Sequence, residues 1–222
     1  MHIETVTLWT ADLNAQHAFY AATLGLEAIA RTPARATLRA GRTLLTFQQH
    51  ADFEGFYHLA FDIPRNRVDE AEVWLRARVP LLEDAKGVSR FPLSEGWNSE
   101  SLYFGDAAGN ILEFIVRRDL PSDSAAPFSP ASILHVSELG VIVPDVTAAV
   151  LDLERRFGLS PFNEQGSTFS PVGDQGGLLI VVREGRGWFP TGRPAIAAPF
   201  RMTFEHQGRV NRLRNGERLQ FP

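Results

Sequence analysis

The sequence predicts an α+β fold built from repeats of one unit, in which a strand leads into a helix and several strands follow. The repeat shows in two stretches, IETVTLWTADL and ELGVIVPDV, which alternate like a strand and then turn at an aspartate. An amphipathic helix is expected between that aspartate and a later glycine, which suits a helix end. The spacing is 13 residues in both copies, from Asp12 to Gly25 and from Asp145 to Gly158.

A second version of the unit lies between these two stretches. It consists of the strand FYHLAFDIP, the helix RVDEAEVWLRARV and the hairpin SLYFGDAAGNILEFIVRR. A fourth unit begins at PFRMTFEH, and the remaining GRVNRLRNGERLQFP is predicted to form a helix and one strand. Because several hairpin-linked strands follow each helix, we expect mixed sheets rather than one parallel sheet.

The stretch at residues 118–132 is rich in Pro, Ser and Ala and is the best candidate for a linker. It divides the chain into residues 1–120, with two paired units and the candidate site, and residues 121–222, with a third unit and a truncated fourth. A chain of 222 residues is long enough for one large domain or two small ones.

Composition and charge exclude several classes of function. The net charge is −4, so the chain lacks the basic surface that nucleic-acid binding requires. It contains no apolar run long enough to span a bilayer, and MHIETVTLWT has no signal-peptide pattern. The absence of cysteine excludes disulfides and thiolate chemistry and fits a cytoplasmic location. These observations leave a small molecule as the expected partner.

Alternation along the strands predicts one face that is rich in polar side chains. The large apolar residues of each strand are expected to face a helix, which leaves the polar residues on the other face. That polar set comprises Thr5, Thr46, Gln48, His58 and Glu113. If the sheets curve around each other, this face lines a cup. Glu113 in ILEFIV would then be a buried carboxylate that needs a partner, and His58 is the expected one.

Three segments give the chain a family resemblance. DLNAQHAFYAATLGL, the histidine of YHLAF and YFGDAAGNILEF resemble the vicinal oxygen chelate superfamily, which includes glyoxalase I, extradiol ring-cleaving dioxygenases and bleomycin and fosfomycin resistance proteins. WNSESLYFGDAAGNILEFIVRR together with GRGWFPTGRP resembles a glyoxalase-like subgroup with a half-duplicated second part. The resemblance implies paired βαβββ modules that form a U-shaped barrel.

The resemblance also implies where a divalent metal would bind. Metalloenzymes of the superfamily take ligands from the first and last strands of each module, and the matching positions are Thr5, Thr46, His58 and Glu113. Two of these are ordinary ligands, and a histidine with a carboxylate suits Fe, Mn, Ni or Zn. Gln48 could add a carbonyl oxygen from the face of Thr46.

The matching positions in the second half do not form a metal-site pattern. They are Glu138, Val181 and Arg201, and the strand for a fourth position is missing. An arginine at a ligand position would repel a cation. The second half is therefore expected to be structural, or to complete a homodimer.

Two hypotheses of function remain open at this point. One is a glyoxalase- or dioxygenase-like enzyme that acts on a small oxygenated molecule, with His58 and Glu113 as metal ligands or as a general-base pair. The other is a metal-free small-molecule binder like the antibiotic-sequestering members, in which Thr5, Thr46 and Gln48 contact the ligand.

Two further features are expected near the cup. Trp97 and Tyr103 should lie beside its mouth, where aromatic side chains pack or stack on a planar ligand. The basic, Gly- and Pro-rich REGRGWFPTGRP could cover one end of the cup, serve as a contact segment or form an ordered surface loop.

Overall fold

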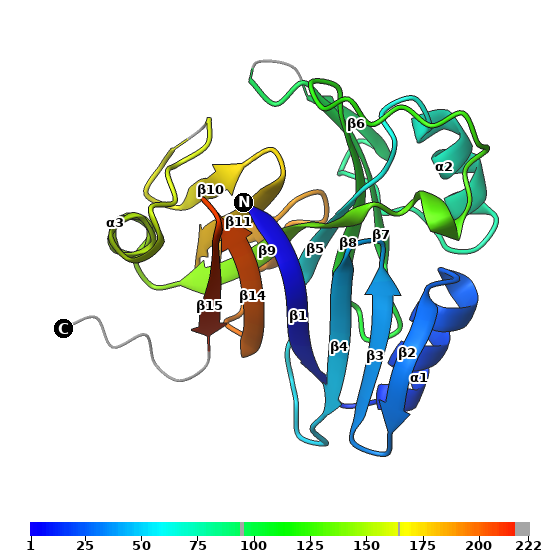
Figure 1. The fold of residues 1–222 in the computed structure, drawn as a ribbon, viewed down its shortest axis with the longest axis horizontal. Coiled ribbons are helices and arrows are strands. Elements are labelled where there is room, and N and C mark those ends of the chain that lie inside the picture. The colour runs from blue at the N-terminus through cyan, green and yellow to red at the C-terminus, as the bar shows by residue number, and fades with distance from the viewer. Residues whose placement is uncertain (94–95, 164, 216–222) are drawn as a thin grey trace.

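Two large curved sheets make up most of the protein, and short helices pack against them (Figure 1). The structure is a computed structural model, and it describes residues 1–93, 96–163 and 165–215. None of the helices formed by these residues combines the length and the apolar character that a membrane crossing needs.

The first two units follow the predicted order of strand, helix and three strands. The first unit consists of β1 (His2–Thr10), α1 (Leu13–Ala18), a π-helical turn η1 (Phe19–Thr23), β2 (Glu27–Thr32), β3 (Arg35–Ala40) and β4 (Thr43–Gln49). The second unit consists of β5 (His58–Asp62), α2 (Val68–Arg76), β6 (Arg90–Leu93), β7 (Ser99–Gly105) and β8 (Ile111–Arg117).

The third and fourth units are shorter. After a 3₁₀ turn η2 (Pro130–Ser132), the chain forms β9 (His135–Val143), α3 (Val146–Phe157), β10 (Phe169–Asp174) and β11 (Gly177–Arg183). A small hairpin and the last two strands follow, namely β12 (Gly187–Trp188), β13 (Arg193–Pro194), β14 (Phe200–His206) and β15 (Arg209–Asn215). The helix expected in GRVNRLRNGERLQFP is wrong for residues 209–215, because β15 pairs with β14 along its whole length. The rest of that segment, residues 216–222, lies outside the described residues.

The helices of the first and third units begin and end alike, as the sequence repeat predicts. Asp12 and Asp145 each accept a hydrogen bond from the backbone N–H three residues later, at 2.9 and 3.0 Å. This cap satisfies one of the free donors at the start of a helix. Gly25 and Gly158 both have a φ of +69°, a left-handed conformation that side chains disfavour.

Each sheet joins one unit from the first half of the chain to one from the second half. The first sheet has six strands in the order β15-β14-β1-β4-β3-β2, and the second has seven in the order β10-β11-β9-β5-β8-β7-β6. Parallel pairs such as β1–β4 and β5–β8 adjoin antiparallel pairs such as β1–β14 and β5–β9. The mixed sheets of the α+β prediction are confirmed. The expected pairing within residues 1–120 differs from this arrangement, because β1 bonds to β14 and β5 bonds to β9.

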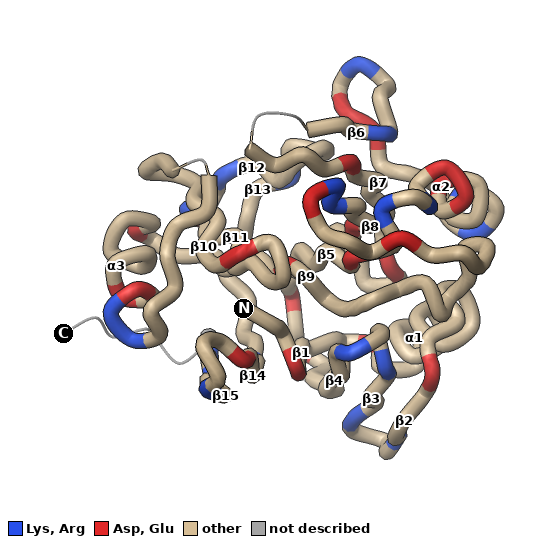
Figure 2. Tube along the Cα trace, turned by 45° about the horizontal axis from the view of Figure 1, so that its top comes forward, with Lys and Arg blue, Asp and Glu red and all other residues tan. Residues whose placement is uncertain are grey.

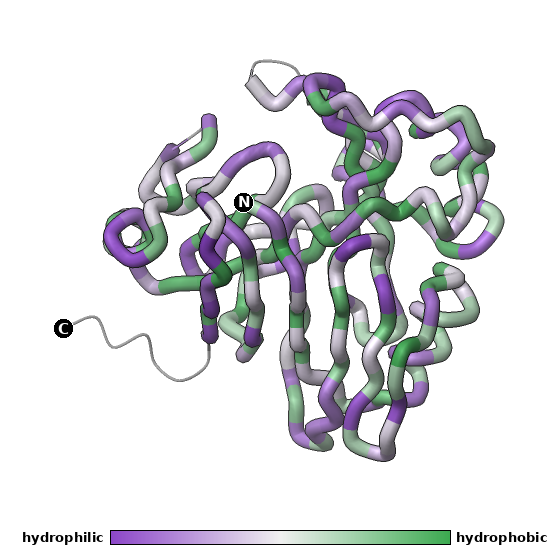
Figure 3. Tube along the Cα trace, in the orientation of Figure 1, coloured by the Kyte–Doolittle hydropathy of each residue, from purple (hydrophilic) through white to green (hydrophobic). Residues whose placement is uncertain are grey.

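The two sheets differ in how many of their faces are buried. The first sheet alternates between buried and more exposed residues, and Figure 3 shows this change of hydropathy along its strands. The central strands of the second sheet, β5, β8 and β9, are buried at every position. A large apolar core lies between the sheets and helices, and a separate apolar cluster that includes Phe91, Tyr103 and Trp188 covers the other face of the second sheet.

The GDAAGN turn between β7 and β8 ties the first unit to the second. Asp106 accepts hydrogen bonds from Gln16 Nε2 at 2.8 Å and from the Tyr20 hydroxyl at 2.9 Å. It also accepts hydrogen bonds from Asn110, whose own Oδ1 accepts the backbone N–H of Tyr57 at 2.8 Å. The turn therefore fixes the chain directly before β5 and β8.

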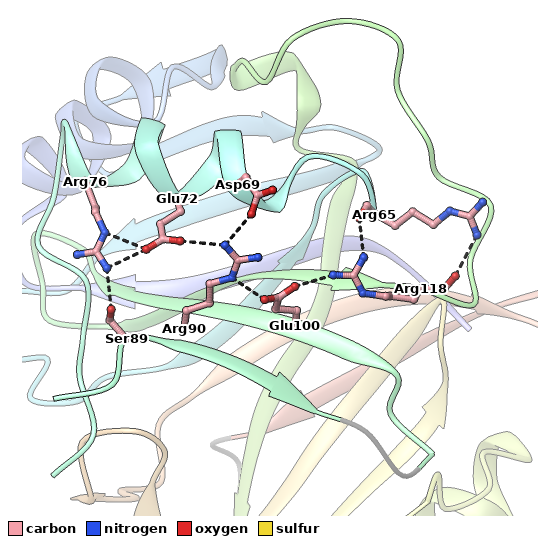
Figure 4. Close-up of polar contacts among 8 residues, drawn as sticks. All are labelled: Arg65, Asp69, Glu72, Arg76, Ser89, Arg90, Glu100 and Arg118. Carbon is pink, nitrogen blue, oxygen red and sulfur yellow. Dashed lines mark hydrogen bonds and ion pairs between the residues drawn. The ribbon is translucent and has the colours of Figure 1, made fainter. Parts of the chain in front are cut away.

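A row of alternating charges fixes the outer strand β6 against α2 (Figure 4). Arg90 donates hydrogen bonds to Asp69 at 2.7 Å, to Glu72 at 3.1 Å and to Glu100 on β7. The next residue, Phe91, is buried and lines a cavity, which is described below. The surface charges thus hold one wall of that cavity in place.

Replacing Asp106 should test the importance of this turn. We expect Asp106→Ala to lower the free energy of unfolding by about 2 to 3 kcal/mol, because it leaves buried donors without their acceptor. Urea unfolding would measure the change, with Asp52→Ala in the exposed β4–β5 loop as control. Equal stabilities of the two variants would contradict a structural role of the turn.

Candidate metal centre

Three ionisable side chains meet on the central strands of the second sheet. Ala60 of β5 lies opposite Glu113 of β8 on one side and opposite Glu138 of β9 on the other. The small side chain of Ala60 leaves room for both carboxylates. His58 lies two residues earlier, on the same face of β5. His58, Glu113 and Glu138 each offer one potential ligand atom, and these three atoms lie within 4.8 Å of one another.

The imidazole of His58 has a defined orientation. Its Nδ1 lies 3.2 Å from the carbonyl oxygen of Ile111, so Nδ1 carries the proton and donates it. Its Nε2 therefore faces the carboxylates, 3.6 Å from Glu113 and 3.8 Å from Glu138. The indole of Trp188 packs against the imidazole, with the ring centres 4.9 Å apart. A glycine at position 140 makes room for this indole, because an added Cβ would lie 2.9 Å from it.

A buried arginine compensates part of the acidic charge. Arg117 is 1% exposed and donates hydrogen bonds to Glu138 at 2.6 Å and to Asp62 at 3.2 Å. His135 lies on the far side of Asp62, with Nε2 3.7 Å from Oδ2. With both histidines neutral, the three carboxylates and Arg117 leave a net negative charge on this cluster.

Burial and neighbouring charges shift the pKa values of the three central groups. Burial and the charge of Glu138 raise the pKa of Glu113 to about 7. Burial also acts to raise the pKa of Glu138, but His58 and Arg117 outweigh it and the pKa lies below its usual range. Burial acts to lower the pKa of His58, but the two glutamates outweigh it and raise the pKa. The pocket thus favours positive charge between the carboxylates.

The three groups line the inner part of a cavity of about 380 Å³. Its walls are largely aromatic, and Trp97 and Tyr103 belong to them, where the sequence places them near the cup. The segment REGRGWFPTGRP contains the β12–β13 hairpin and contributes Arg186, Trp188 and Phe189 to the lining. Most of its other residues are exposed, so the segment forms part of the surface and also borders the cavity.

The structure does not bring Thr5, Thr46 and Gln48 to His58 and Glu113. These three residues belong to β1 and β4 of the first sheet, because the first unit pairs with the fourth unit rather than the second. The hydroxyl of Thr5 is hydrogen-bonded to Thr203 at 2.9 Å, and that of Thr46 to Thr37 at 3.0 Å. The hydroxyls of Thr5 and Thr46 are therefore bonded to neighbouring strands of their own sheet.

Sequence reasoning considered Glu138 but gave it no role at the site. It lies at the centre of HVSELGVIV, as Glu113 lies at the centre of ILEFIV, and both are buried. The rule that a carboxylate in an apolar strand needs a partner would have found both residues. Arg201, expected to repel a cation, lies instead over the ring of Trp9 on the first sheet, 5.3 Å from its centre.

The fold resembles solved structures of two enzyme types. A candidate dioxygenase from Bacillus subtilis has a TM-score of 0.61 at 19% identity, and the match covers 95% of this chain and 68% of that protein. Glyoxalase I from Zea mays has a TM-score of 0.55 at 14% identity, with 82% of this chain and 66% of that chain covered. The chain has the vicinal oxygen chelate fold. No family model matches the sequence, and a search of curated proteins finds no match. The chain spans about two thirds of the length of these two structures.

Arg117 should be essential for stability, whereas its neighbour should not. Arg117→Leu leaves Asp62 and Glu138 buried without their cation, so we expect the free energy of unfolding to fall by about 3 to 5 kcal/mol. Arg118→Leu removes a partly exposed ion pair and should change it by about 1 kcal/mol or less. Urea unfolding of both variants would measure this difference. Similar losses would show that the buried network contributes no more than a surface pair.

His135 should make the protein less stable in acid. Burial, Arg42 and His2 lower its pKa to about 4, whereas an unfolded histidine titrates near 6.5. The unfolded chain therefore binds a proton that the folded chain does not, so this contribution is complete above pH 6.5 and is lost as the pH falls towards 4.

We expect His135→Gln to reduce the loss of stability between pH 7 and pH 4.5 by about 2 kcal/mol. Urea unfolding at both pH values in the presence of a chelator would measure it. His50→Gln, in an exposed loop, is the control and should keep the wild-type loss. An unchanged loss in His135→Gln would show that this histidine does not titrate as described.

Proposed function

We propose that the protein is a metal-dependent, glyoxalase- or dioxygenase-like enzyme that acts on a small oxygenated molecule. His58, Glu113 and Glu138 would hold one divalent metal ion. The observation that carries the proposal is the approach of three potential ligand atoms to within 4.8 Å of one another, inside a cavity. The fold supports it, since known metalloenzymes adopt the same fold.

The residues present fit a divalent metal ion. The separations of 3.6 and 3.8 Å between His58 Nε2 and the two carboxylates are too long for good hydrogen bonds. The bond from Nδ1 to the Ile111 carbonyl leaves the lone pair of Nε2 directed at two acceptors. A cation between these groups would satisfy all three. One imidazole and two carboxylates suit Fe, Mn, Ni or Zn and disfavour soft Cu(I).

The residues around such a site would have different roles in positioning its ligands and the substrate. A bound divalent metal would polarise a substrate oxygen as a Lewis acid. Arg117 holds Glu138 in place, and the Ile111 carbonyl and Trp188 orient His58. The aromatic walls would provide an apolar surface for the rest of the substrate.

Metal analysis would test the proposal directly. We expect protein grown with Fe, Mn, Ni and Zn to retain about one ion per chain, and a chelator to lower its melting temperature. His58→Ala, Glu113→Gln and Glu138→Gln should each weaken zinc binding by roughly 100-fold or more, since even outer groups change metal affinity by about 10- to 100-fold.

Thr46→Val is the matched control, because Thr46 is equally buried but lies on the other sheet. It should bind zinc like the wild type. Protein with no metal above trace in every growth medium would contradict the proposal and favour the metal-free binder.

A further inference from the structure

We propose that the β12–β13 hairpin, residues 187–194, is a hinged cover over the metal site, that Arg193 fastens it shut, and that a metal ion enters and leaves when the hairpin lifts. This inference rests on the proposed function for the metal itself. It adds a moving element that controls how fast the metal exchanges, and a residue that positions this element.

The hairpin covers the candidate ligands from one side. Its Trp188 packs against the imidazole of His58. Its Phe189 meets Phe91 of β6 and Tyr103 of β7 edge to face, with ring centres 4.6 and 5.5 Å apart. In the view of Figure 2, β12 and β13 lie between β11 and β6. His58 and the two glutamates are each at most 4% exposed, so an incoming hydrated ion finds little open surface on them while the hairpin is in place.

The hairpin is a separate element on a narrow base. β12 and β13 have two residues each and pair with each other rather than with either large sheet. The two ends of the hairpin meet in a pair of 2.8 Å backbone hydrogen bonds, from the Gly185 N–H to the Ala195 carbonyl and from the Ala195 N–H to the Arg186 carbonyl. Gly185 has a φ of +80°, and an added Cβ there would meet no atom within 4 Å. This glycine therefore serves the backbone conformation rather than close packing, which suits a hinge.

One arginine fastens the returning strand of the hairpin to the rest of the protein. Arg193 of β13 donates a hydrogen bond to the Gly109 carbonyl at 2.7 Å, and its guanidinium lies 3.5 Å over the ring of Phe56. Gly109 belongs to the GDAAGN turn, which fixes the starts of β5 and β8. Arg193 is exposed, and among the described residues it lies outside the cavity lining. It therefore acts on the metal site through the hairpin.

A second contact holds the hairpin from the inside. Gly140 of β9 lies against the indole of Trp188, where an added Cβ would lie 2.9 Å from the ring. Trp188 is 4% exposed, so lifting the hairpin would expose a large apolar surface to water. The closed position is therefore the stable one, and the open form is a minor population.

Loosening the arginine contact should change the rates of zinc exchange but not the affinity for zinc. Arg193 holds the hairpin in the same way in the free and the metal-bound protein, so its loss raises the open fraction of both. While the closed form predominates, association and dissociation then speed up by the same factor, and their ratio, the dissociation constant, is unchanged. A residue that supports the ligands themselves would change the dissociation constant instead.

Stopped-flow zinc binding and chelator-driven zinc release would measure these rates. We expect Arg193→Gln to raise both about tenfold and to leave the dissociation constant within about twofold. Tenfold corresponds to about 1.4 kcal/mol, the size expected for losing one hydrogen bond and one cation–π contact. Arg193→Lys should give rates between those of the wild type and Arg193→Gln.

Arg78→Gln is the matched control. Arg78 also donates to a backbone carbonyl, that of Trp74 at 2.9 Å, and lies 4.0 Å over the ring of Trp74, but it follows α2, away from the hairpin. It should keep the wild-type rates. Thermal unfolding of each variant would confirm that the fold is retained.

Labelling of an introduced thiol would test the cover without metal. The chain has no cysteine, so Ile180→Cys, at a position that is 4% exposed and lines the cavity, gives the only thiol. In chelator-treated protein, dithionitrobenzoate should label this thiol about tenfold faster when Arg193→Gln is added. Adding Arg78→Gln should leave the labelling rate unchanged.

Two results would overturn the inference: labelling rates that are equal with and without Arg193→Gln, or zinc exchange rates in Arg193→Gln that equal those of the wild type. A change in only one of the two zinc rates would also overturn it, because Arg193 would then support the ligands. The proposed function fails separately. If zinc does not bind to the wild type, the metal centre is wrong, and the labelling rates alone decide whether the hairpin is a cover fastened by Arg193.

Discussion

The position of β5 between β8 and β9 is the constraint on which the site depends. Side chains on one face of a central strand lie next to side chains of both neighbouring strands. At Ala60 this places the carboxylate of Glu113 on one side and the carboxylate of Glu138 on the other. Two acids held this close on two buried strands repel each other unless positive charge is supplied. Arg117 supplies part of this charge from the same face of β8, four residues beyond Glu113, and His58 supplies a nitrogen that faces the two carboxylates. The pairing of β5 with β8 and β9 thus brings the side chains of the site together and gives the site a negative charge that favours a bound cation.

The two faces of the second sheet serve different purposes. One face packs against the helices and the other sheet in the large apolar core. The opposite face would be exposed in an isolated sheet, but the hairpin from residues 187–194 and the aromatic cluster cover it. Covering this face with aromatic side chains buries the charged groups, and burial strengthens each electrostatic interaction among them. A space remains between cover and sheet, and that space is the cavity.

Periodicity in the sequence predicts faces of strands, but it does not predict which strands are neighbours. The meeting of His58 and Glu113 could be foreseen because both lie in one unit, on strands that the repeat pattern makes adjacent. The buried-carboxylate rule marks Glu138 as a residue that needs a partner, but its position beside Glu113 could not be foreseen while the first and second units were expected to pair. The same assumption led us to expect Thr5, Thr46 and Gln48 near His58 and Glu113, whereas they lie on the other sheet. Alternation along β1 predicts which residues share a face of the strand. It does not predict that β1 is hydrogen-bonded to β14, about 200 residues away, because that pairing leaves no pattern in the local sequence.

The pairing of β1 with β14 also affects how the chain can assemble. Thr5 and Thr203 are 198 positions apart, so the pairing of β1 with β14 closes a very long loop. The strands around the cavity, β5, β8 and β9, lie within residues 58–143 and close much shorter loops. Loop closure entropy rises with the logarithm of loop length, and non-local pairing slows folding. During synthesis β1 therefore emerges well before β14, and one edge of β1 stays unpaired until β14 has been made.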